Sequence, residues 1–420
     1  MLSVKDNELL TRVGPGTPMG EVFRRYWLPA VLSEELPESD GAPVRVRLLG
    51  EDLVAFRDSA GKVGLVSAFC PHRRAPLFFG RNEEGGIRCV YHGWKFDRNG
   101  HCVDMPSEPP DSLFKTKVAV EAYPTHEAGD MIWAYLGPPG AKPPLPDYEL
   151  LRAPAASRHA SKTYQECNYL QALEGGLDSA HFTILHNENI GDGSFLEHAS
   201  SPDLDIEPTA YGYRYSALRF SGSEQWVRAY QFLMPAQQMR AARVPSIVPE
   251  GEPTRVEGHI WVPIDDTTTW SYNWFYAYET DGTFTPEQRD ERERRAGRGP
   301  EDLLPGYRSK RNLSNDYMID RERQRTTSFT GISGVNTQDM AVQEGMGPVV
   351  DRTREHLGTT DRPVIIMRQM LLEATRDVAA GTAPRGSQPE SYRDVRPLDH
   401  MIPRELDWKV ALRNELIAKF

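Results

Sequence analysis

Apolar and polar residues alternate with a period of two along much of the first third of the chain. Residues 44–69 read VRVRLLGEDLVAFRDSAGKVGLVSAF, which contains several short runs of the β type. Gly50 and a turn at residues 58–62 interrupt these runs, as expected between neighbouring strands. The pattern predicts an N-terminal all-β domain that ends near Gly137.

A proline-rich segment separates this region from the rest of the chain. Residues 138–148, PPGAKPPLPDY, contain five prolines, which neither a central strand nor a helix interior tolerates. We therefore expect an N-terminal arm and helix over residues 1–40, a β domain over 41–137, a linker over 138–150 and a larger domain over 151–420.

Strands and helices are both expected in the larger domain. Long alternating runs follow one another at residues 211–219, 226–235, 255–264 and 268–278. Their succession predicts an antiparallel meander, and helical stretches at 169–180 and 337–344 flank it. The fold class is therefore α+β. A run of charged residues at 286–311 is interpreted as a solvated helix and loop rather than as a binding site.

Composition and charge exclude several classes of protein. The chain has 420 residues, with 60 acidic and 49 basic side chains and a formal net charge of −11, so it lacks the basic surface of a nucleic-acid-binding protein. Its apolar runs fall far short of the about 20 residues of a membrane span, and the start MLSVKDNELL has no apolar core of a secretion signal. We expect a cytoplasmic protein with neither a nucleic-acid nor a membrane partner.

Two cysteines and two histidines are gathered in one short interval. Cys70 and His72 form a Cys-x-His pair, Cys89 and His92 form a Cys-x-x-His pair, and sixteen residues lie between the pairs. This spacing predicts two loops from neighbouring β-hairpins, each with one thiolate and one imidazole. A tetrahedral zinc ion accepts such a set. So does a Rieske [2Fe-2S] cluster, which takes two cysteines on one iron and two histidines on the other.

The residues around these ligands decide between the two centres. The loops read CPHR and CVYHGW, and they closely resemble the signature of the Rieske domain. The resemblance implies that Cys70, His72, Cys89 and His92 bind a [2Fe-2S] cluster. Cys102 and Cys167 lie outside the motif and are interpreted as small buried residues.

A second set of polar residues lies in ECNYLQALEGGLDSAHFTILH, residues 166–186. If residues 169–181 are helical, Gln171, Glu174, Asp178 and His181 form one polar stripe. His186 would then lie about 140° from His181, so the helix has to loosen or end before both imidazoles can meet one metal. The alternative interpretation is an amphipathic helix with a solvated polar face.

This stretch resembles the D-x-x-H-x-x-x-x-H arrangement of the Rieske non-haem iron oxygenases. The resemblance extends over nearly the whole chain and favours the phthalate dioxygenase branch, whose catalytic domain has a helix-grip, START-like fold. It implies that His181 and His186 bind mononuclear Fe(II) together with Asp339. Asp320, Asp351 and Asp361 are competing aspartates that spacing alone does not exclude.

The resemblance also implies roles for residues near this site. Asp178 would hydrogen-bond a ligand histidine and a Rieske histidine of the neighbouring subunit, in a ring that we expect to be a trimer. One departure from relatives is the pair Gly175 and Gly176, where some carry Asn-Leu, which leaves the role of an amide near the iron open. Arg228, which shares a strand face with Trp226 and Tyr230, either enters an aromatic pocket or packs outward over aromatic rings.

The activity implied by the family is O2-dependent dihydroxylation, hydroxylation or O-demethylation of an aromatic, carboxylated substrate. A separate NAD(P)H-dependent reductase with flavin and an iron–sulfur cluster would supply electrons, and the chain has no G-x-G-x-x-G after a strand to hold a nicotinamide itself. Two alternatives remain, namely a Rieske electron-transfer protein without oxygenase chemistry and a zinc-ribbon interaction protein.

Overall fold

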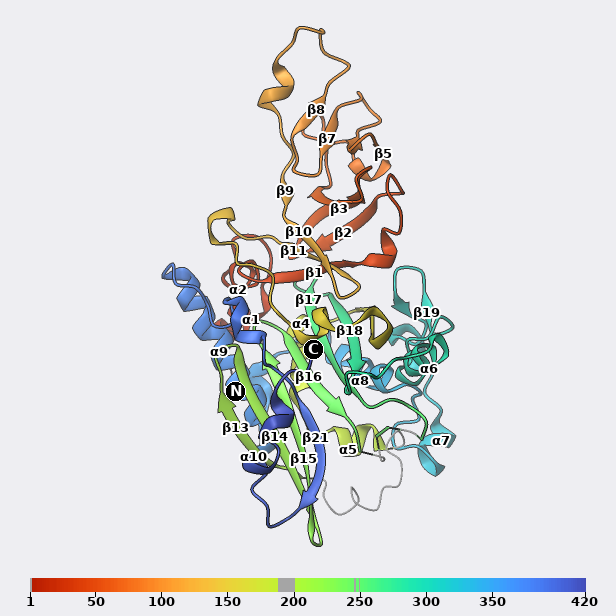
Figure 1. The fold of residues 1–420 in the computed structure, drawn as a ribbon, viewed down its shortest axis with the longest axis vertical. Helices are drawn as coiled ribbons and strands as arrows, with labels where there is room; N and C mark the ends of the chain where they lie inside the picture. The colour runs from red at the N-terminus through yellow and green to blue at the C-terminus, as the bar shows by residue number, and fades with distance from the viewer. Residues whose placement is uncertain (1, 188–200, 245–246, 249) are drawn as a thin grey trace.

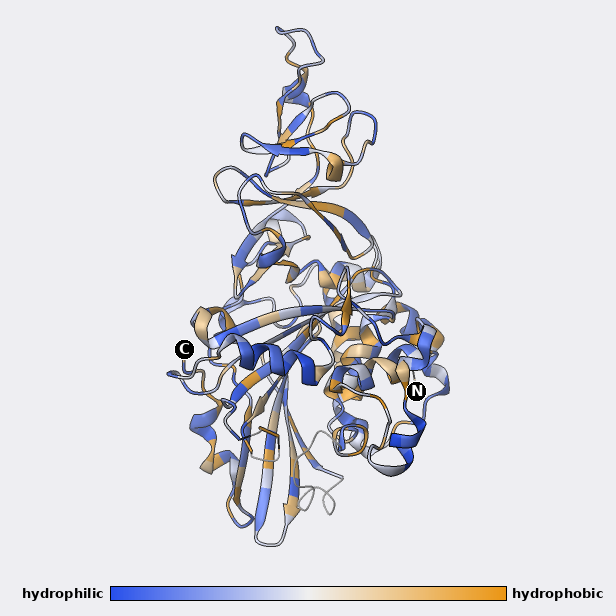
Figure 2. Cartoon of the chain, turned by 90° about the vertical axis from the view of Figure 1, so that its right-hand side faces the viewer, coloured by the Kyte–Doolittle hydropathy of each residue, from blue (hydrophilic) through white to orange (hydrophobic). Residues whose placement is uncertain are grey.

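The computed structural model describes residues 2–187, 201–244, 247–248 and 250–420. A β-rich module made from the first third of the chain stands at one end of a larger domain (Figure 1). Figure 2 shows that strands of the larger domain carry hydrophobic and hydrophilic residues side by side, so its sheet is not a purely apolar layer. Among the described residues, no helix is both long and apolar enough to cross a membrane.

The module is all-β, as predicted. One sheet has the order β1-β11-β10, a second the order β2-β3-β4-β9, and a third the order β5-β6-β7-β8. The strands are β1 Trp27–Leu32, β2 Val44–Leu48, β3 Glu51–Arg57, β4 Val63–Ser67, β5 Arg81–Glu83, β6 Gly86–Arg88, β7 Lys95–Asp97, β8 Cys102–Asp104, β9 Ala122–Tyr123, β10 Thr125–Ala128 and β11 Met131–Tyr135. Gly50 and Gly61 have φ values of 78° and 74° and form the predicted turns between β2, β3 and β4.

The larger domain is built on an extended sheet with the order β13-β14-β15-β16-β17-β18-β12-β20-β19, and β21 pairs with β15. Its strands are β12 Arg158–Gln165, β13 Asp203–Pro208, β14 Gly212–Ser221, β15 Glu224–Leu233, β16 Gln237–Ala242, β17 Arg255–Pro263, β18 Thr269–Ala277, β19 Leu303–Leu304, β20 Arg308–Ser309 and β21 Leu398–Pro403. The predicted runs correspond to β14, β15, β17 and β18, and the antiparallel sheet is confirmed. The predicted succession was wrong in one respect, because β16 lies between β15 and β17.

Helices cover one face of this sheet near the centre of the domain. The α-helices are α1 Val4–Thr11, α2 Pro18–Phe23, α3 Glu149–Arg152, α4 Tyr169–Leu177, α5 Phe182–Leu185, α6 Pro286–Ala296, α7 Arg321–Thr326, α8 Val335–Gly345, α9 Arg362–Ala379 and α10 Trp408–Ala411. Helix α4 contacts α8 as well as strands β16 and β17. The N-terminal helices α1 and α2 contact α9, so the start of the chain packs on the larger domain.

The charged run forms helix α6, and its interpretation as a solvated helix was correct for one face of the helix and wrong for the other. Thr285 caps the helix by accepting from the Gln288 N–H, and Gly297 ends it with a φ of 79°. One face is buried: Arg292 donates to Glu257 of β17 at 2.7 Å, and Glu293 is paired with Arg298 at 2.9 Å. Arg292 also lines a cavity described below. The charges on this face therefore belong to the interior of the domain.

Candidate active site

The two cysteine–histidine loops have the same backbone design. The N–H of Cys70 donates to the carbonyl of Ala75, and the N–H of Arg74 returns to the carbonyl of Cys70. The second loop repeats this pattern at the same sequence offsets. The N–H of Cys89 donates to the carbonyl of Trp94, and the N–H of Gly93 donates to the carbonyl of Cys89. The residue four positions after each cysteine has a positive φ, 60° at Arg74 and 78° at Gly93. Each loop is thus a tight turn that presents a cysteine and, two or three residues later, a histidine.

The four side chains of these loops lie together with the thiols inside and the imidazoles nearer the surface. Cys70 and Cys89 are 1% and 2% exposed, and His72 and His92 are half-buried with ring centroids 4.4 Å apart. Burial, followed by the neighbouring thiol of Cys89, raises the pKa of Cys70 to about 11. The buried Nδ1 of His72 has no partner among the described residues. Clustered thiols and an imidazole nitrogen left free suit a [2Fe-2S] cluster.

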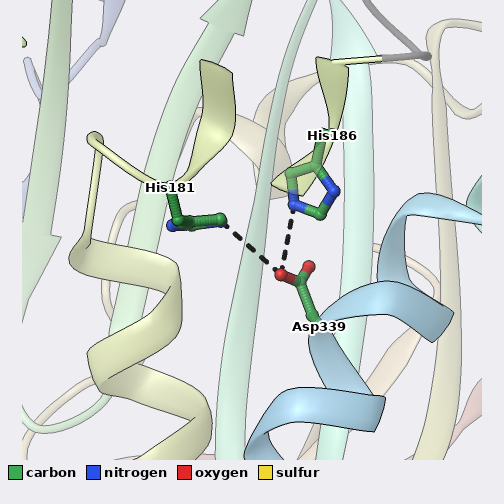
Figure 3. A group of neighbouring side chains, drawn as sticks. All are labelled: His181, His186 and Asp339. Atoms are coloured by element: carbon green, nitrogen blue, oxygen red, sulfur yellow. Dashed lines mark hydrogen bonds and ion pairs between the residues drawn. The ribbon is translucent and has the colours of Figure 1, made fainter. Parts of the chain in front are cut away.

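A second group of ligand-type side chains lies in the larger domain. Donor atoms of His181, His186 and Asp339 all lie within 4.8 Å of one another. Asp339 Oδ1 is 3.1 Å from His186 Nε2 and 3.5 Å from His181 Nε2, and Figure 3 shows the three side chains pointing toward one another. Two imidazoles and one carboxylate in this arrangement form the donor set of a facial triad for Fe(II).

The end of helix α4 brings the two histidines together. The helix begins after Asn168, whose side chain accepts from the Leu170 N–H, and it ends at Leu177, before the predicted limit. His181 and His186 then stand at the two ends of the one-turn helix α5. The prediction that the helix loosens or ends before the two imidazoles can approach one another is confirmed, because α4 ends at Leu177.

The polar stripe predicted along α4 is therefore wrong. Gln171 donates to the carbonyl oxygens of Gln343 and Gly347 in the interior, and Glu174 pairs with two buried arginines, Arg352 and Arg368. These side chains fix α4 against neighbouring segments and do not form a face with His181.

Each histidine of the triad is held at its Nδ1 atom. His186 Nδ1 donates to Gln338 Oε1 at 2.7 Å, and His181 Nδ1 is 3.4 Å from Asp178 Oδ2. These partners engage Nδ1 and leave the Nε2 atom of each ring directed to Asp339. A histidine that binds a metal through Nε2 requires its proton at Nδ1, where such a partner accepts it. The sequence pattern does not identify Gln338, because a glutamine is not one of the ligands of a facial triad, although Gln338 directly precedes Asp339.

The charges of the triad stabilise one another. Burial opposes ionisation of Asp339, but the imidazoles of His186 and His181 outweigh it and hold the pKa of that carboxyl well below its usual range. Burial likewise opposes protonation of His181, yet Asp178 and Asp339 raise its pKa to about 10. The site is thus arranged to hold positive charge between carboxylates, as a divalent cation would supply it.

The competing aspartates lie elsewhere and have local structural roles. Asp320 accepts from the N–H groups of Glu322 and Arg323 at the start of α7. Asp351 accepts from the N–H of Thr353, and Asp361 accepts from the N–H of Gly358. Asp339 alone of the four aspartates considered is a member of the triad group.

A cavity of about 320 Å³ adjoins the triad. Its walls combine aromatic and apolar side chains with several charged ones. The lining includes Asp178, His181, Phe182, His186, Arg228, Tyr230, Arg240, Arg255, Glu257, Trp261, Arg292, Asp339, Met340 and Gln343. A volume in this range suits a small organic ligand.

Arg228 lies in the wall of this cavity rather than on the outer surface. It is 2% exposed, and its guanidinium carbon lies 4.7 Å from the ring centroid of Phe182. One terminal nitrogen donates to the carbonyl of Ala241 at 3.3 Å, and Nε has no partner among the described residues. The outward alternative is therefore wrong, and Arg228 offers a positive charge beside aromatic rings.

The two glycines of α4 lie where side chains of the cavity wall approach closely. A Cβ atom on Gly175 would lie 2.2 Å from Gln343 Nε2, and one on Gly176 would lie 2.1 Å from the Trp261 ring. Gln343 and Trp261 thus occupy the space that side chains at these two positions would need. The amide that contacts a triad histidine is that of Gln338 on α8.

Comparisons with known proteins agree with this architecture. Residues 26–124 match the family described as the Rieske [2Fe-2S] domain, and residues 134–418 match the family described as LigXa C-terminal domain like. The zinc-ribbon alternative and the alternative of an electron-transfer protein without oxygenase chemistry are therefore wrong.

Relatives over the whole length include two oxygenase subunits. The chain is 38% identical to the phthalate 4,5-dioxygenase oxygenase subunit of Pseudomonas putida, over 97% of this chain and 94% of the relative. It is 36% identical to the 3-chlorobenzoate-3,4-dioxygenase oxygenase subunit of Comamonas testosteroni, over 99% of each. The crystal structure of dicamba monooxygenase bound to dicamba shares the fold, with a TM-score of 0.62 at 19% identity over 85% of this chain and 98% of that one. The chain belongs to the Rieske non-haem iron oxygenases, as an oxygenase subunit of the phthalate dioxygenase-like branch.

Proposed function

We propose that this oxygenase subunit binds Fe(II) through His181, His186 and Asp339 and oxidises an aromatic acid in the adjoining cavity. The observation that carries the proposal is the convergence of two imidazoles and one carboxylate at the wall of a cavity that Arg228 also lines. The donor set fits Fe(II), because a facial triad of two imidazoles and one carboxylate leaves coordination positions open. Bound there, iron would supply the activation of dioxygen.

The surrounding residues would orient the ligands. Gln338 and Asp178 hold the Nδ1 atoms of His186 and His181, so both Nε2 atoms face Asp339. Such partners fix the ring orientation and the basicity of ligand histidines. Trp261, Phe182 and Met340 supply apolar walls that keep bulk water from the reacting atoms.

Arg228 would bind the acid group of the substrate. A buried guanidinium recognises a carboxylate by charge-assisted hydrogen bonds, and the rings of Phe182 and Tyr230 beside it suit an aromatic body. The named relatives act on phthalate and 3-chlorobenzoate, which are aromatic acids, and a further relative is 5,5'-dehydrodivanillate O-demethylase. Dihydroxylation, hydroxylation and O-demethylation would use the same iron ligands, so product analysis distinguishes them.

Electrons would pass between chains of a ring, for which we propose a trimer. Figure 1 shows the sheet β5–β8, whose strands β6 and β7 flank the second cysteine loop, at the opposite end of the molecule from α5. Transfer from the cluster to iron within one chain would have to cross that length. A head-to-tail arrangement of copies instead closes into a ring and brings the cluster loops of one chain to the iron of the next.

Exposed apolar side chains support this arrangement. Val90 and Tyr91 lie in the second cysteine loop and Phe114 contacts Trp94 beside it, while Val342 lies on α8 and Met346 directly after it. Clustered exposed apolar residues mark protein contact surfaces. Asp178 would then join His181 to a Rieske histidine of the neighbouring subunit, and a separate NAD(P)H-dependent reductase would feed the cluster.

An iron count and oxygen uptake test the proposal together. The purified chain should contain three iron atoms, two in the cluster and one in the triad. With a surrogate reductase and benzoate, phthalate or vanillate as probes, at least one probe should stimulate O2 uptake with equimolar oxidised product. A chain with full iron that gives no probe-dependent uptake and no product from any aromatic acid contradicts the proposed substrate class.

A further inference from the structure

Three arginines surround one buried carboxylate in the wall of the cavity. Glu257 of β17 accepts from Arg240 Nε at 2.9 Å, from Arg255 Nε at 2.8 Å and from a terminal nitrogen of Arg292 at 2.7 Å. Glu257 is 5% exposed, and all four residues line the cavity. Arg240, Arg255 and Arg292 are called the arginine group below.

The arginine group carries more positive charge than its own carboxylate neutralises. Burial opposes ionisation of Glu257, but Arg292, Arg240 and Arg255 outweigh it and hold its pKa well below the usual range. Three guanidinium groups against one carboxylate leave a charge of +2. Glu252 contacts both Arg255, at 3.5 Å, and Arg295, at 2.9 Å, so counting Glu252 together with Arg295 leaves the net charge at +2. An excess charge in a buried wall requires a further anion or a large desolvation cost.

Donor groups beside the arginines also lack acceptors. Gln238 Oε1 accepts from Arg240 at 3.2 Å, which fixes the amide, and its buried Nε2 has no partner among the described residues. His259 adds no positive charge, because burial and the nearby Arg240 lower its pKa to about 3. Its Nε2 lies 3.2 Å from Arg240 and its Nδ1 lies 2.8 Å from Asn273 Oδ1. This part of the wall is thus rich in donors and poor in acceptors.

Within the arginine group, Arg255 lies apart from Arg228. Arg228 belongs to β15 and Arg240 to the adjacent β16, whereas Arg255 belongs to β17, two strands from β15. Two interstrand spacings amount to about 10 Å. Side chains on one face of a sheet stand roughly perpendicular to it, so Arg255 and Arg228 mark two separate cationic positions. Carboxylates on adjacent carbons of one ring are closer together than this separation.

We propose that the arginine group is a second anion subsite, which binds an acid group of the substrate remote from the acid group at Arg228. The ligand class is an aromatic compound with two non-adjacent carboxylates. Glu257 acts as a positioning residue that holds the three guanidinium groups with their remaining N–H donors toward the cavity. This inference rests on the proposed function for the orientation of the substrate toward the triad.

A purely structural role for the same ion pairs predicts different behaviour. In that case Glu257 and Arg292 only fasten helix α6 to the sheet, and loss of Arg292 weakens the binding of every ligand alike. A subsite instead predicts a loss that depends on the number and the spacing of acid groups. The two readings are separated by equilibrium binding, which needs no turnover.

The test compares Arg292→Gln with Arg294→Gln in the full-length protein loaded with cluster and iron. Arg294 lies on the same helix but is paired with Glu291 at the surface and does not line the cavity. Calorimetry would measure the dissociation constants of benzoate, benzene-1,2-dicarboxylate and benzene-1,4-dicarboxylate. Loss of one charged hydrogen-bonding partner should weaken binding of the 1,4-dicarboxylate by about 10–100-fold. Benzoate binding should change less than about threefold, and Arg294→Gln should leave all three constants unchanged.

Several results would overturn the inference. They are an equal loss for all three probes in a folded Arg292→Gln protein, an unchanged constant for the 1,4-dicarboxylate, and a larger loss for the 1,2- than for the 1,4-dicarboxylate. If Arg292→Gln does not fold, Arg292→Lys keeps the charge without the planar fork and should give a smaller loss with the same selectivity. Selective binding in a protein that oxidises none of the probes would refute the proposed function and leave the subsite standing.

Discussion

The histidines of the two clusters differ in how their ring nitrogens are held. In the loops of Cys70 and Cys89 the thiols are buried, the imidazoles are half-buried, and His72 Nδ1 has no protein partner among the described residues. In the triad, His186 is 3% exposed and both of its ring nitrogens are engaged, by Gln338 and Asp339. The first arrangement suits exchange of electrons at a surface. The second suits a metal ion held in the wall of a cavity.

The comparison shows that the chemistry of an imidazole is set by what holds it. A histidine near the surface with a free nitrogen gives its electron pair to a cluster and stays close to an approaching partner. A buried histidine with a fixed Nδ1 has a single tautomer and a single direction for Nε2.

The largest effect is expected from the cysteines. Cys70→Ser and Cys89→Ser should each abolish the visible Rieske absorption and all oxygenase activity, because a thiolate holds the buried iron of the cluster. Absorption spectroscopy and O2 uptake measure both properties. Cys102→Ser, at a cysteine outside the two loops, should keep the spectrum. Cluster absorption that survives in both loop variants would contradict the assignment.

Asp339→Ala should act on the other centre alone. Removal of the carboxylate leaves two imidazoles, so mononuclear iron should be lost while the cluster spectrum stays. Activity should fall by more than the about 100-fold that is typical of outer-sphere changes. Metal analysis should then find two iron atoms per chain instead of three. Full iron and normal turnover would show that Asp339 is not the third ligand.

Asp178→Asn should separate binding of the metals from transfer between them. The amide keeps the shape but loses the charge that faces His181, so both metals and the oligomer should remain while turnover falls about 10–100-fold. Asp351→Asn, at an aspartate that only caps a turn, is the matched control. Rapid mixing of reduced protein with O2 and substrate should show slower oxidation of the cluster in Asp178→Asn. An unchanged rate of cluster oxidation would refute the bridging role.

Mixed rings test the route between chains. Chains that lack only the cluster and chains that lack only the mononuclear iron should regain partial activity when they assemble together. Mixed rings that form but stay inactive would mean that electrons move within a chain.

The smallest of these effects is expected at Gln338. Gln338→Leu should weaken iron binding by about tenfold, because His186 loses the acceptor that fixes its tautomer. Titration of the iron-depleted protein with Fe(II) measures the change. Gln343→Leu, on the same helix and without a histidine contact, should bind iron as the unaltered protein does. Equal affinities in the two variants would mean that Gln338 does not orient the ligand.

Prediction from the sequence succeeded where the determining contacts are local. The four ligand-type residues between Cys70 and His92 are close together in the chain. Their positions relative to one another in the fold therefore follow from local structure. The long strands β14, β15, β17 and β18 could be predicted, because apolar and polar residues alternate over many positions in each of them. Strand β16, QQMRAA, is short and rich in polar residues, and its burial depends on β15 and β17 on either side.

Non-local contacts set the limit of that prediction. Asp339 lies about 150 residues beyond His186, and spacing alone did not select it from four aspartates. The resemblance to a family and its place in the predicted helical stretch at 337–344 favoured it. The charges of α6 were predicted to face solvent, because the sequence of a helix alone does not show that Arg292 pairs with Glu257 of β17. The sequence around Gln338 does not indicate a role at the metal site. That role is evident only from the position of His186 beside it in the fold.

The brevity of α5 has a thermodynamic consequence. A helix of four residues, Phe182–Leu185, is far below the length at which an isolated helix is stable in water. The triad histidines lie at the two ends of α5, so an ion that binds both would restrain both ends of this segment. Order in this segment and occupancy of the metal site are then linked equilibria. At a free ion concentration 100 times the dissociation constant, this linkage would contribute about 2.7 kcal/mol to the free energy of unfolding.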